Sequence, residues 1–156
     1  MERSVENLRS NLIYTTGNIL DSSSQCLVNP VNTVGVMGKG LALDFKRAYP
    51  NMFDTYKRQC AKGAFKTGRI MFYRMKDDAH IVCLFPTKEH WRNPSKLEYI
   101  EDGLKAFVKY YAEWEITSAA FPKLGCGLGG LDWEHHVRPL MERYLGDLPI
   151  PIEIYI

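Results

Sequence analysis

Two glycine-rich stretches contain the residues that are most suited to chemistry. Residues 122–133 read PKLGCGLGGLDW and place four glycines in six positions, and residues 29–40 read NPVNTVGVMGKG. Glycine at this density costs conformational entropy on folding and weakens regular structure, so it usually marks a place where a ligand approaches the main chain. The obvious candidate for that ligand is a phosphate group.

Each stretch lies between an apolar segment and the start of a predicted helix. Unpaired backbone amides and the positive end of the helix dipole favour an anion at such a helix N-terminus. Either stretch alone is explained as well by a tight turn. Because the chain has two of them, we expect a ligand with two phosphates, and hence a nucleotide.

Two common nucleotide-binding motifs are absent from these stretches. A P-loop needs Ser or Thr after its Gly-Lys pair, whereas Gly38 and Lys39 are followed by Gly40. The dinucleotide-binding order G-x-G-x-x-G is reversed at Gly35, Gly38 and Gly40, and no acidic residue closes a following strand. The sequence therefore disfavours a kinase, an ATPase and a hydride-transfer enzyme.

Alternating strands and helices must position the glycine stretches. Short β-rich segments bounded by Gly, Pro, Asp or Asn predict strands at residues 12–14, 26–28, 69–73, 80–85, 118–121 and 152–155. Helical spacing of apolar residues predicts helices at residues 41–49, 51–62 and 95–113, and a last helix from residue 132 or 137 to 145. This alternation indicates an α/β fold in three layers, with about six strands covered by helices on both faces.

Four residues predict where the last two helices begin. Ser95 and Glu98 have the spacing of a capping box, so the third helix should begin at Ser95. Pro139 should kink the last helix or mark its true start, and Asp132 should cap it.

Composition limits the class of protein. The 156 residues are 46% hydrophobic and 24% charged, which predicts one globular domain over residues 1–156, with residues 1–10 as an N-terminal extension. No apolar run approaches the roughly 20 residues of a membrane span, and the charged opening is unlike a secretory signal. We therefore expect a soluble, cytoplasmic protein. The net charge of +2 is too small to indicate nucleic-acid binding by itself.

Metal chemistry is not expected. The four cysteines are scattered, at positions 26, 60, 83 and 126, without the close pairing of a zinc or redox motif, so we interpret them as reduced thiols. His135 and His136 are adjacent and would point about 100° apart on a helix, which prevents them from chelating one metal ion.

Several blocks of the sequence resemble the macrodomains, a family that binds ADP-ribose. The blocks are GNI at residues 17–19, NPVN at residues 29–32, GVMGKGLA at residues 35–42 and GCGLGGLDW at residues 125–133. The resemblance runs from about Leu12 to the C-terminus.

Within that family, three blocks together are most similar to the DarG antitoxins, which remove ADP-ribose from DNA bases modified by DarT toxins. They are VMGKG at residues 36–40, FPTKEHWR at residues 85–92 and GGLDW at residues 129–133. The resemblance implies an α/β/α sandwich with a mixed sheet and a metal-independent ADP-ribosyl glycohydrolase that uses no cofactor. It further implies ADP-ribosylated single-stranded DNA, with thymidine as the modified nucleoside, as substrate and a DarT-like toxin as partner.

The family's ligand contacts can be carried over to matching positions. Asn18 and Ile19 would lie near the adenine, and the two glycine stretches would wrap the diphosphate from opposite sides. The residues implied to contact ADP-ribose are Asn18, Ile19, Asn29, Gly35, Val36, Met37, Gly38, Lys39, Gly40, Thr87, Leu124, Gly125, Cys126, Gly127, Leu128 and Gly129.

Lys88 corresponds to the catalytic lysine of the DarG subgroup. Breaking an N-glycosidic bond develops positive charge at C1″ of the ribose and negative charge on the departing base. An ammonium could protonate that base, and an amine with a lowered pKa could attack C1″. Asn32 would face the distal ribose, where it could polarise the sugar or position water.

Three neighbouring features qualify this mechanism. The related terminal ADP-ribose glycohydrolases pair their lysine with an aspartate where this chain has Gly129, which disfavours a covalent lysine intermediate resolved by that acid. Trp91 could stack on the modified base and Arg92 could contact a DNA phosphate, although packing explains both residues as well.

Two other functions stay open at this point. One is a hydrolase of ADP-ribosylated protein carboxylates, or of ADP-ribose 1″-phosphate or O-acetyl-ADP-ribose. The other is a non-catalytic module that binds ADP-ribose. Lys88 in its motif favours DNA deglycosylation, and the missing aspartate argues against the enzyme for protein carboxylates.

Overall fold

A computed structural model describes residues 11–76 and 79–156, and the expected extension over residues 1–10 lies outside the described part. One sheet of six strands runs through it in the order β1-β6-β5-β2-β4-β3. The strands are β1 (Leu12–Thr15), β2 (Cys26–Val31), β3 (Met71–Arg74), β4 (Ile81–Pro86), β5 (Ala119–Phe121) and β6 (Ile152–Tyr155). Only β3 pairs antiparallel, with β4. The predicted mixed sheet and α/β class are confirmed, while a single domain over residues 1–156 stays a prediction.

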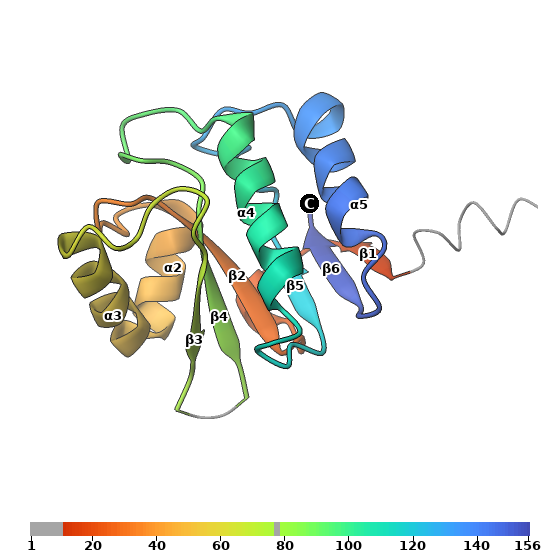
Figure 1. Cartoon of the computed structure of the whole chain (residues 1–156), viewed down its shortest axis with the longest axis horizontal. Helices are drawn as coiled ribbons and strands as arrows, with labels where there is room; N and C mark the ends of the chain where they lie inside the picture. The colour runs from red at the N-terminus through yellow and green to blue at the C-terminus, as the bar shows by residue number, and fades with distance from the viewer. Residues whose placement is uncertain (1–10, 77–78) are drawn as a thin grey trace, which may run out of the picture.

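Helices cover both faces of the sheet (Figure 1). Helices α2 (Gly40–Ala48) and α3 (Pro50–Ala61) belong to one layer, and α4 (Leu97–Tyr110) and α5 (Arg138–Leu145) to the other. Two buried clusters reflect the alternation of side chains along each strand. On β4, Cys83 packs in the cluster beneath α4 and α5, and its neighbour Val82 packs in the cluster beneath α2 and α3. The three-layer sandwich is therefore confirmed.

One glycine of helix α4 packs directly against a side chain of the sheet. A Cβ atom on Gly103 would lie 2.3 Å from the ring of Phe85 on β4, so only glycine fits there. Ile100, Leu104 and Phe107 bury the same face of the helix completely. The close contact fixes the N-terminal end of α4 beside the loops that follow the strands.

The predicted start of the third helix is wrong. Helix α4 begins at Leu97, and its N-cap Lys96 makes no side-chain capping bond. Ser95 is instead buried, and its backbone N–H donates to the carbonyl of Gly129 at 3.0 Å. The helix also ends at Tyr110 and not at residue 113. A long-range contact thus replaces the local cap that the sequence predicts.

The start of the last helix agrees with the prediction. Asp132 caps the short helix η2 (Trp133–Val137), where its carboxylate accepts from the backbone N–H of His135 at 2.9 Å. Helix α5 then begins at Arg138, with Pro139 in its first turn. A proline is tolerated there because the first helical N–H groups have no partner within the helix.

Candidate functional site

Three loops meet at one edge of the sheet because they follow three adjacent parallel strands. Val31 at the end of β2 is in register with Pro86 at the end of β4, and β5 lies on the other side of β2. We call residues 32–40 the first glycine loop, residues 87–96 the lysine loop and residues 124–130 the second glycine loop. Carboxyl ends of adjacent strands are the usual ligand site of such sheets.

The first glycine loop is held by the side chain of Asn32. Its Oδ1 accepts from the backbone N–H of Val34 at 3.1 Å and of Val36 at 3.4 Å, and its Nδ2 donates to the carbonyl of Val36 at 2.8 Å. The hydroxyl of Tyr56 on α3 lies 2.8 Å from both Oδ1 and the backbone carbonyl of Asn32. Burial raises the pKa of Tyr56, so this hydroxyl stays protonated. Asn32 therefore shapes the loop, whatever else it does.

The second glycine loop is held by its own backbone. Leu131 N–H donates to the carbonyl of Gly125 at 2.9 Å, and Gly130 N–H donates to that of Gly127 at 3.3 Å. Gly129 packs so tightly that an added Cβ would lie 2.3 Å from Ser95 Oγ and 2.4 Å from the Gly125 oxygen. No side chain fits at position 129, so the aspartate of the related glycohydrolases has no place in this loop.

Two glycines of these loops are not required by the fold. A Cβ on Gly127 would meet nothing within 4 Å, and one on Gly38 would meet only Val36 Cγ1 at 3.5 Å. Neither has a left-handed backbone, in contrast to Gly35 and Gly40. The chain thus keeps two bare positions where its own packing would accept a side chain. Such bare positions leave space in which a ligand could approach the backbone.

Lys88 bridges the lysine loop and the second glycine loop. Its ammonium donates to the carbonyl of Trp91 at 3.3 Å and to that of Leu128 at 3.2 Å. Partial burial lowers the pKa of this amine below its usual value. Among the residues that the structure describes, Lys88 makes none of the ion pairs. An unpaired cation at a loop junction is suited to a charge that develops during a reaction.

Further contacts join the first glycine loop to the other two. The backbone N–H and the hydroxyl of Thr33 both donate to the carbonyl of Glu89, at 3.1 and 3.0 Å. The Leu128 side chain lies against Gly40, where a Cβ would be 3.6 Å from its Cδ1. The three loops therefore form one continuous surface.

Burial divides the residues predicted to contact ADP-ribose into two sets. The buried set consists of Ile19, Asn29, Gly35, Met37, Thr87, Leu124, Gly125 and Gly129. The set that reaches the surface consists of Asn18, Val36, Gly38, Lys39, Gly40, Cys126, Gly127 and Leu128. Ligand contact for the second set stays a prediction, and its exposure is what such contact requires.

The predicted adenine contacts occupy a separate short turn. The Asn18 Oδ1 accepts from the backbone N–H of Leu20 at 3.0 Å and so caps the 3-10 helix η1 (Ile19–Asp21). Ile19 packs in the core with 3% of its surface exposed. Asn18 is exposed, so of the two residues it is the one whose side chain can meet a base.

An exposed aromatic and cationic cluster lies beside Lys88. Trp91 is 44% exposed, the His90 ring lies 5.0 Å from it, and the Arg92 guanidinium lies 4.6 Å from its centre. The three side chains are consecutive in the lysine loop, and the Trp91 carbonyl accepts from Lys88. The Lys88 ammonium thus contacts the backbone of the residue that carries the exposed ring.

Other groups near the loops are poor candidates for catalysis. Burial raises the pKa of the Cys126 thiol to about 11, so it is not a thiolate at neutral pH. The Asp132 carboxylate is bonded to the N–H of His135, which lowers its pKa, and it also meets the His135 ring. No group of three or more His, Cys, Asp or Glu side chains within residues 11–76 and 79–156 is placed to hold a metal ion.

Two supporting residues were not found from the sequence. Tyr56 holds Asn32 and Ser95 holds Gly129, yet both lie far from these partners along the chain. Tyr56 reads as one of many apolar positions of a helix, and Ser95 as a helix cap. No signal in the sequence separates these roles.

Comparison with known proteins agrees with this geometry and with the resemblance seen in the sequence. The profile of the Macro domain matches residues 28–140. The DNA ADP-ribosyl glycohydrolase of Thermus aquaticus is 48% identical over 124 residues, which cover 78% of this chain and 34% of that protein. The chain thus spans about a third of the length of this curated relative.

Solved structures agree as well. The macrodomain of Mycobacterium tuberculosis DarG has a TM-score of 0.89 and 42% identity, covering 92% of this chain and 96% of that one. Thermosipho africanus DarTG in complex with ADP-ribose has a TM-score of 0.88 and 42% identity, covering 95% of this chain and 42% of that one. The span that matches the family profile contains all three loops, and the chain belongs to the Macro domain family.

Proposed function

We propose that the protein is a DNA ADP-ribosyl glycohydrolase that removes ADP-ribose from a base of single-stranded DNA. The observation that carries the proposal is the position of Lys88, whose ammonium joins the lysine loop to the glycine loop at Leu128. The open backbone at Gly38 and Gly127 leaves room for the diphosphate. The Thermus aquaticus relative, which carries this activity in its name, matches over 78% of the chain.

The reaction exchanges one bond for another. The N-glycosidic bond between C1″ of the distal ribose and the base breaks, and its electron pair leaves with the base. Lys88 gives a proton to that base, and water adds to C1″ and returns a proton to the amine. Partial burial lowers the pKa of Lys88 and so makes it a stronger acid than a solvated lysine. Asn32 positions the first glycine loop against the ribose through its bonds to Val34 and Val36.

DNA as the substrate is supported by the cluster beside Lys88. Trp91 offers an exposed ring and Arg92 a cation, the two groups that single-strand binders use for bases and phosphates. We infer a DarT-like transferase as the partner that produces the substrate, because a Thermosipho africanus relative is a fusion of a DNA ADP-ribosyl transferase with a DNA ADP-ribosyl glycohydrolase. Among the described residues, no helix is long and apolar enough to cross a membrane. We expect the protein to act in the cytoplasm, where bacterial DNA lies.

Release of ADP-ribose from an oligonucleotide with ADP-ribosylated thymidine tests the proposal. A protein with ADP-ribosylated glutamate and ADP-ribose 1″-phosphate are assayed in parallel as alternative substrates. We expect release from the DNA, and a loss of turnover in Lys88→Ala of about 10²- to 10⁴-fold, the usual range for a general acid. Lys96→Ala is the matched control, because Lys96 lies in the same loop and its ammonium lies over the Tyr99 ring, 5.6 Å from the ring centre.

Calorimetry with ADP-ribose separates binding from chemistry. Lys88→Ala should bind ADP-ribose nearly as well as the unaltered protein, since Lys88 acts on the bond and not on the diphosphate. An equal loss of binding and turnover would contradict the catalytic role. If the protein binds ADP-ribose but releases it from none of the three substrates, the proposed enzymatic activity would be wrong, and the protein would be a non-catalytic module that binds ADP-ribose.

A further inference from the structure

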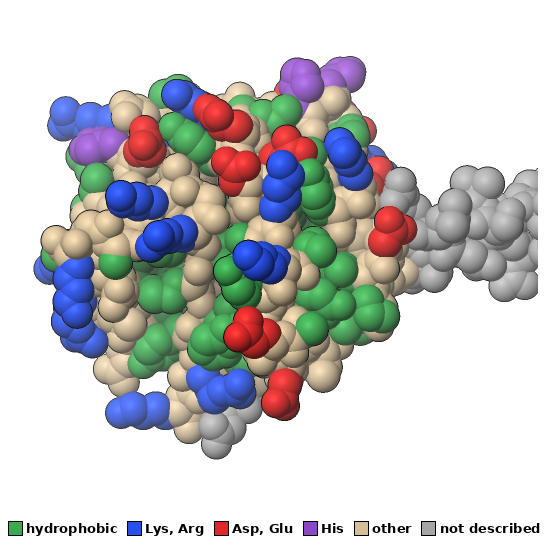
Figure 2. Space-filling model, viewed as in Figure 1, with side chains coloured by type: hydrophobic (Ala, Val, Ile, Leu, Met, Phe, Trp, Pro, Cys, Tyr) green, Lys and Arg blue, Asp and Glu red, His purple; other side chains and the backbone are tan. Residues whose placement is uncertain are grey.

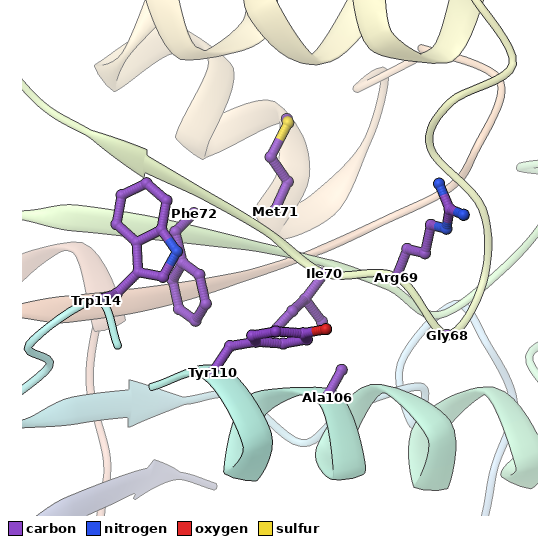
Figure 3. Close-up of a pocket in the computed structure, with 8 residues that line it drawn as sticks. All are labelled: Gly68, Arg69, Ile70, Met71, Phe72, Ala106, Tyr110 and Trp114. Atoms are coloured by element: carbon purple, nitrogen blue, oxygen red, sulfur yellow. The ribbon is translucent and has the colours of Figure 1, made fainter. Parts of the chain in front are cut away.

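An open groove lies between the edge strand β3 and helix α4, away from the three loops (Figure 3). One hollow of about 500 Å³ is lined by residues from Gly68 to Phe72 and by Ala106, Tyr110 and Trp114. A second hollow of about 450 Å³ shares Arg69 and Tyr110 with the first and adds Lys105 and Lys109. We call the two together the edge groove.

Two aromatic rings in the edge groove face solvent. Tyr110 is 39% exposed and Trp114 is 36% exposed. The Trp114 ring lies 5.3 Å from that of Phe72, and Figure 3 shows Tyr110 beside Ile70. Met71 points to the opposite side of the strand. The groove therefore presents two accessible rings over an apolar floor. A contiguous exposed apolar patch of this kind often marks a binding site.

Two lysines of α4 lie beside these rings. Lys105 and Lys109 are exposed on α4, and the Lys109 ammonium lies 5.2 Å from the centre of the Tyr110 ring. The Arg69 side chain lies on the same side of the chain as that of Met71, away from the two rings, and donates to the carbonyl of Ala64 (Figure 3). Asp102 is the one carboxylate among the residues that line the two hollows. Figure 2 shows Lys and Arg side chains interspersed with Asp and Glu side chains on this face of the molecule.

The edge groove is within reach of the lysine loop. Met71 on β3 pairs with Leu84 on β4, and Lys88 follows Leu84 by four residues. A fully extended chain spans at most about 3.6 Å per residue, so Leu84 lies within roughly 14 Å of Lys88. A few nucleotides of an extended strand cover such a distance.

We propose that the edge groove binds the nucleotides that flank the ADP-ribosylated base, an inference that rests on the proposed function. Bases stack on Tyr110 and Trp114, and the phosphates face Lys105 and Lys109. Aromatic rings beside cations are the means by which proteins hold single strands without reading their sequence. A peptide added to the edge of β3 would use backbone hydrogen bonds and would not depend on these lysines.

Binding of a labelled, unmodified oligonucleotide of about 12 nucleotides tests the inference, since single-strand sites span about 4 to 16 nucleotides. The double variant Lys105→Gln/Lys109→Gln should bind more weakly, and the slope of log affinity against log salt should fall by about 0.7 for each lysine. Trp114→Ala and Tyr110→Ala should each weaken binding roughly tenfold. The matched control is Lys46→Gln/Arg47→Gln on α2, which removes the same charge from the opposite face of the sheet.

Turnover separates this inference from the proposed function. The lysine variant should raise the KM for an ADP-ribosylated oligonucleotide and leave kcat unchanged, and it should act normally on ADP-ribosylated thymidine as the free nucleoside. If the lysine variant and the control have equal affinity, salt slope and KM, the edge groove does not bind the flanking nucleotides. The proposed glycohydrolase activity would be unaffected by that result. No release from any ADP-ribosylated DNA by the unaltered protein would overturn the proposed function instead. Tyr110→Ala keeps the test valid if Trp114→Ala fails to fold.

Discussion

The two glycine loops face the same site but are stabilised by different means. The first is shaped by a polar side chain, because Asn32 bonds three backbone groups and is itself held by Tyr56. The second is shaped by its backbone and by the close packing of Gly129 on Ser95 and Gly125. Two loops with similar glycine content are therefore stabilised by different interactions. A methyl group added at Gly129 should break the second loop, whereas loss of the Tyr56 hydroxyl should loosen the first.

The largest effect on stability is expected from Gly129→Ala. Its Cβ would lie 2.4 Å from the Gly125 oxygen, a backbone atom that cannot turn away. We expect a loss of about 3 kcal/mol in the free energy of unfolding, the upper range for overpacking. For a chain of this size that corresponds to roughly 6 to 12 °C in melting temperature.

Two companion variants sharpen the Gly129 experiment. Gly127→Ala adds the same methyl group where nothing lies within 4 Å, so its melting temperature should stay unchanged. Ser95→Ala combined with Gly129→Ala should restore only part of the stability, because the contact with the Gly125 oxygen remains. Equal melting temperatures for Gly129→Ala and Gly127→Ala would contradict the proposed construction of the second loop.

Binding should be lost without any loss of stability in Gly127→Val. The Cβ atom of the valine would meet nothing within 4 Å, and the side chain would occupy the space that we assign to the diphosphate. We expect the Kd for ADP-ribose to rise about 30-fold, which equals about 2 kcal/mol, with the free energy of unfolding changed by less than about 0.5 kcal/mol. Calorimetric titration and thermal melting measure the two quantities. Unchanged affinity would remove the argument for a phosphate cradle.

Gly38→Val asks the same question of the first loop. The nearest atom to its Cβ would be Val36 Cγ1 at 3.5 Å, an ordinary contact. A loss of affinity in both valine variants would mean that both loops touch the ligand. A loss in Gly127→Val alone would assign the diphosphate to the second loop.

Local sequence patterns were sufficient to predict the strands, the layers and the positions of both glycine loops. Each depends on residues that are neighbours in the chain, such as the apolar run at β4 or the glycines of residues 125–130. Lys88 was found only through the resemblance to a family, since a lysine beside Glu89 otherwise indicates a solvated surface. In the structure, its ammonium donates to the carbonyl of Leu128, 40 residues later in the chain.

Long-range contacts explain what the sequence could not predict. Ser95 has the spacing of a helix cap, but its bond to Gly129 moves the start of α4 to Leu97. Tyr56 has the spacing of a core residue, and it is one, yet its hydroxyl also reaches Asn32, 24 residues earlier. In both cases one residue type serves two roles, and only the fold decides between them.

The smallest effect is expected from Tyr56→Phe, which removes one hydroxyl from beneath the first loop. Asn32 keeps its bonds to Val34 and Val36, so the loop should loosen and not collapse. A net hydrogen bond contributes about 1 kcal/mol, which corresponds to a Kd for ADP-ribose about fivefold weaker. Amide hydrogen exchange at Val34 and Val36 should quicken, while exchange in the second glycine loop stays unchanged. Tyr73→Phe on β3 is the control, because Tyr73 pairs with Val82 near the start of β4, at the end of the strand opposite the loops. Faster exchange in both loops would mean that they are coupled and that the contrast between them is not real.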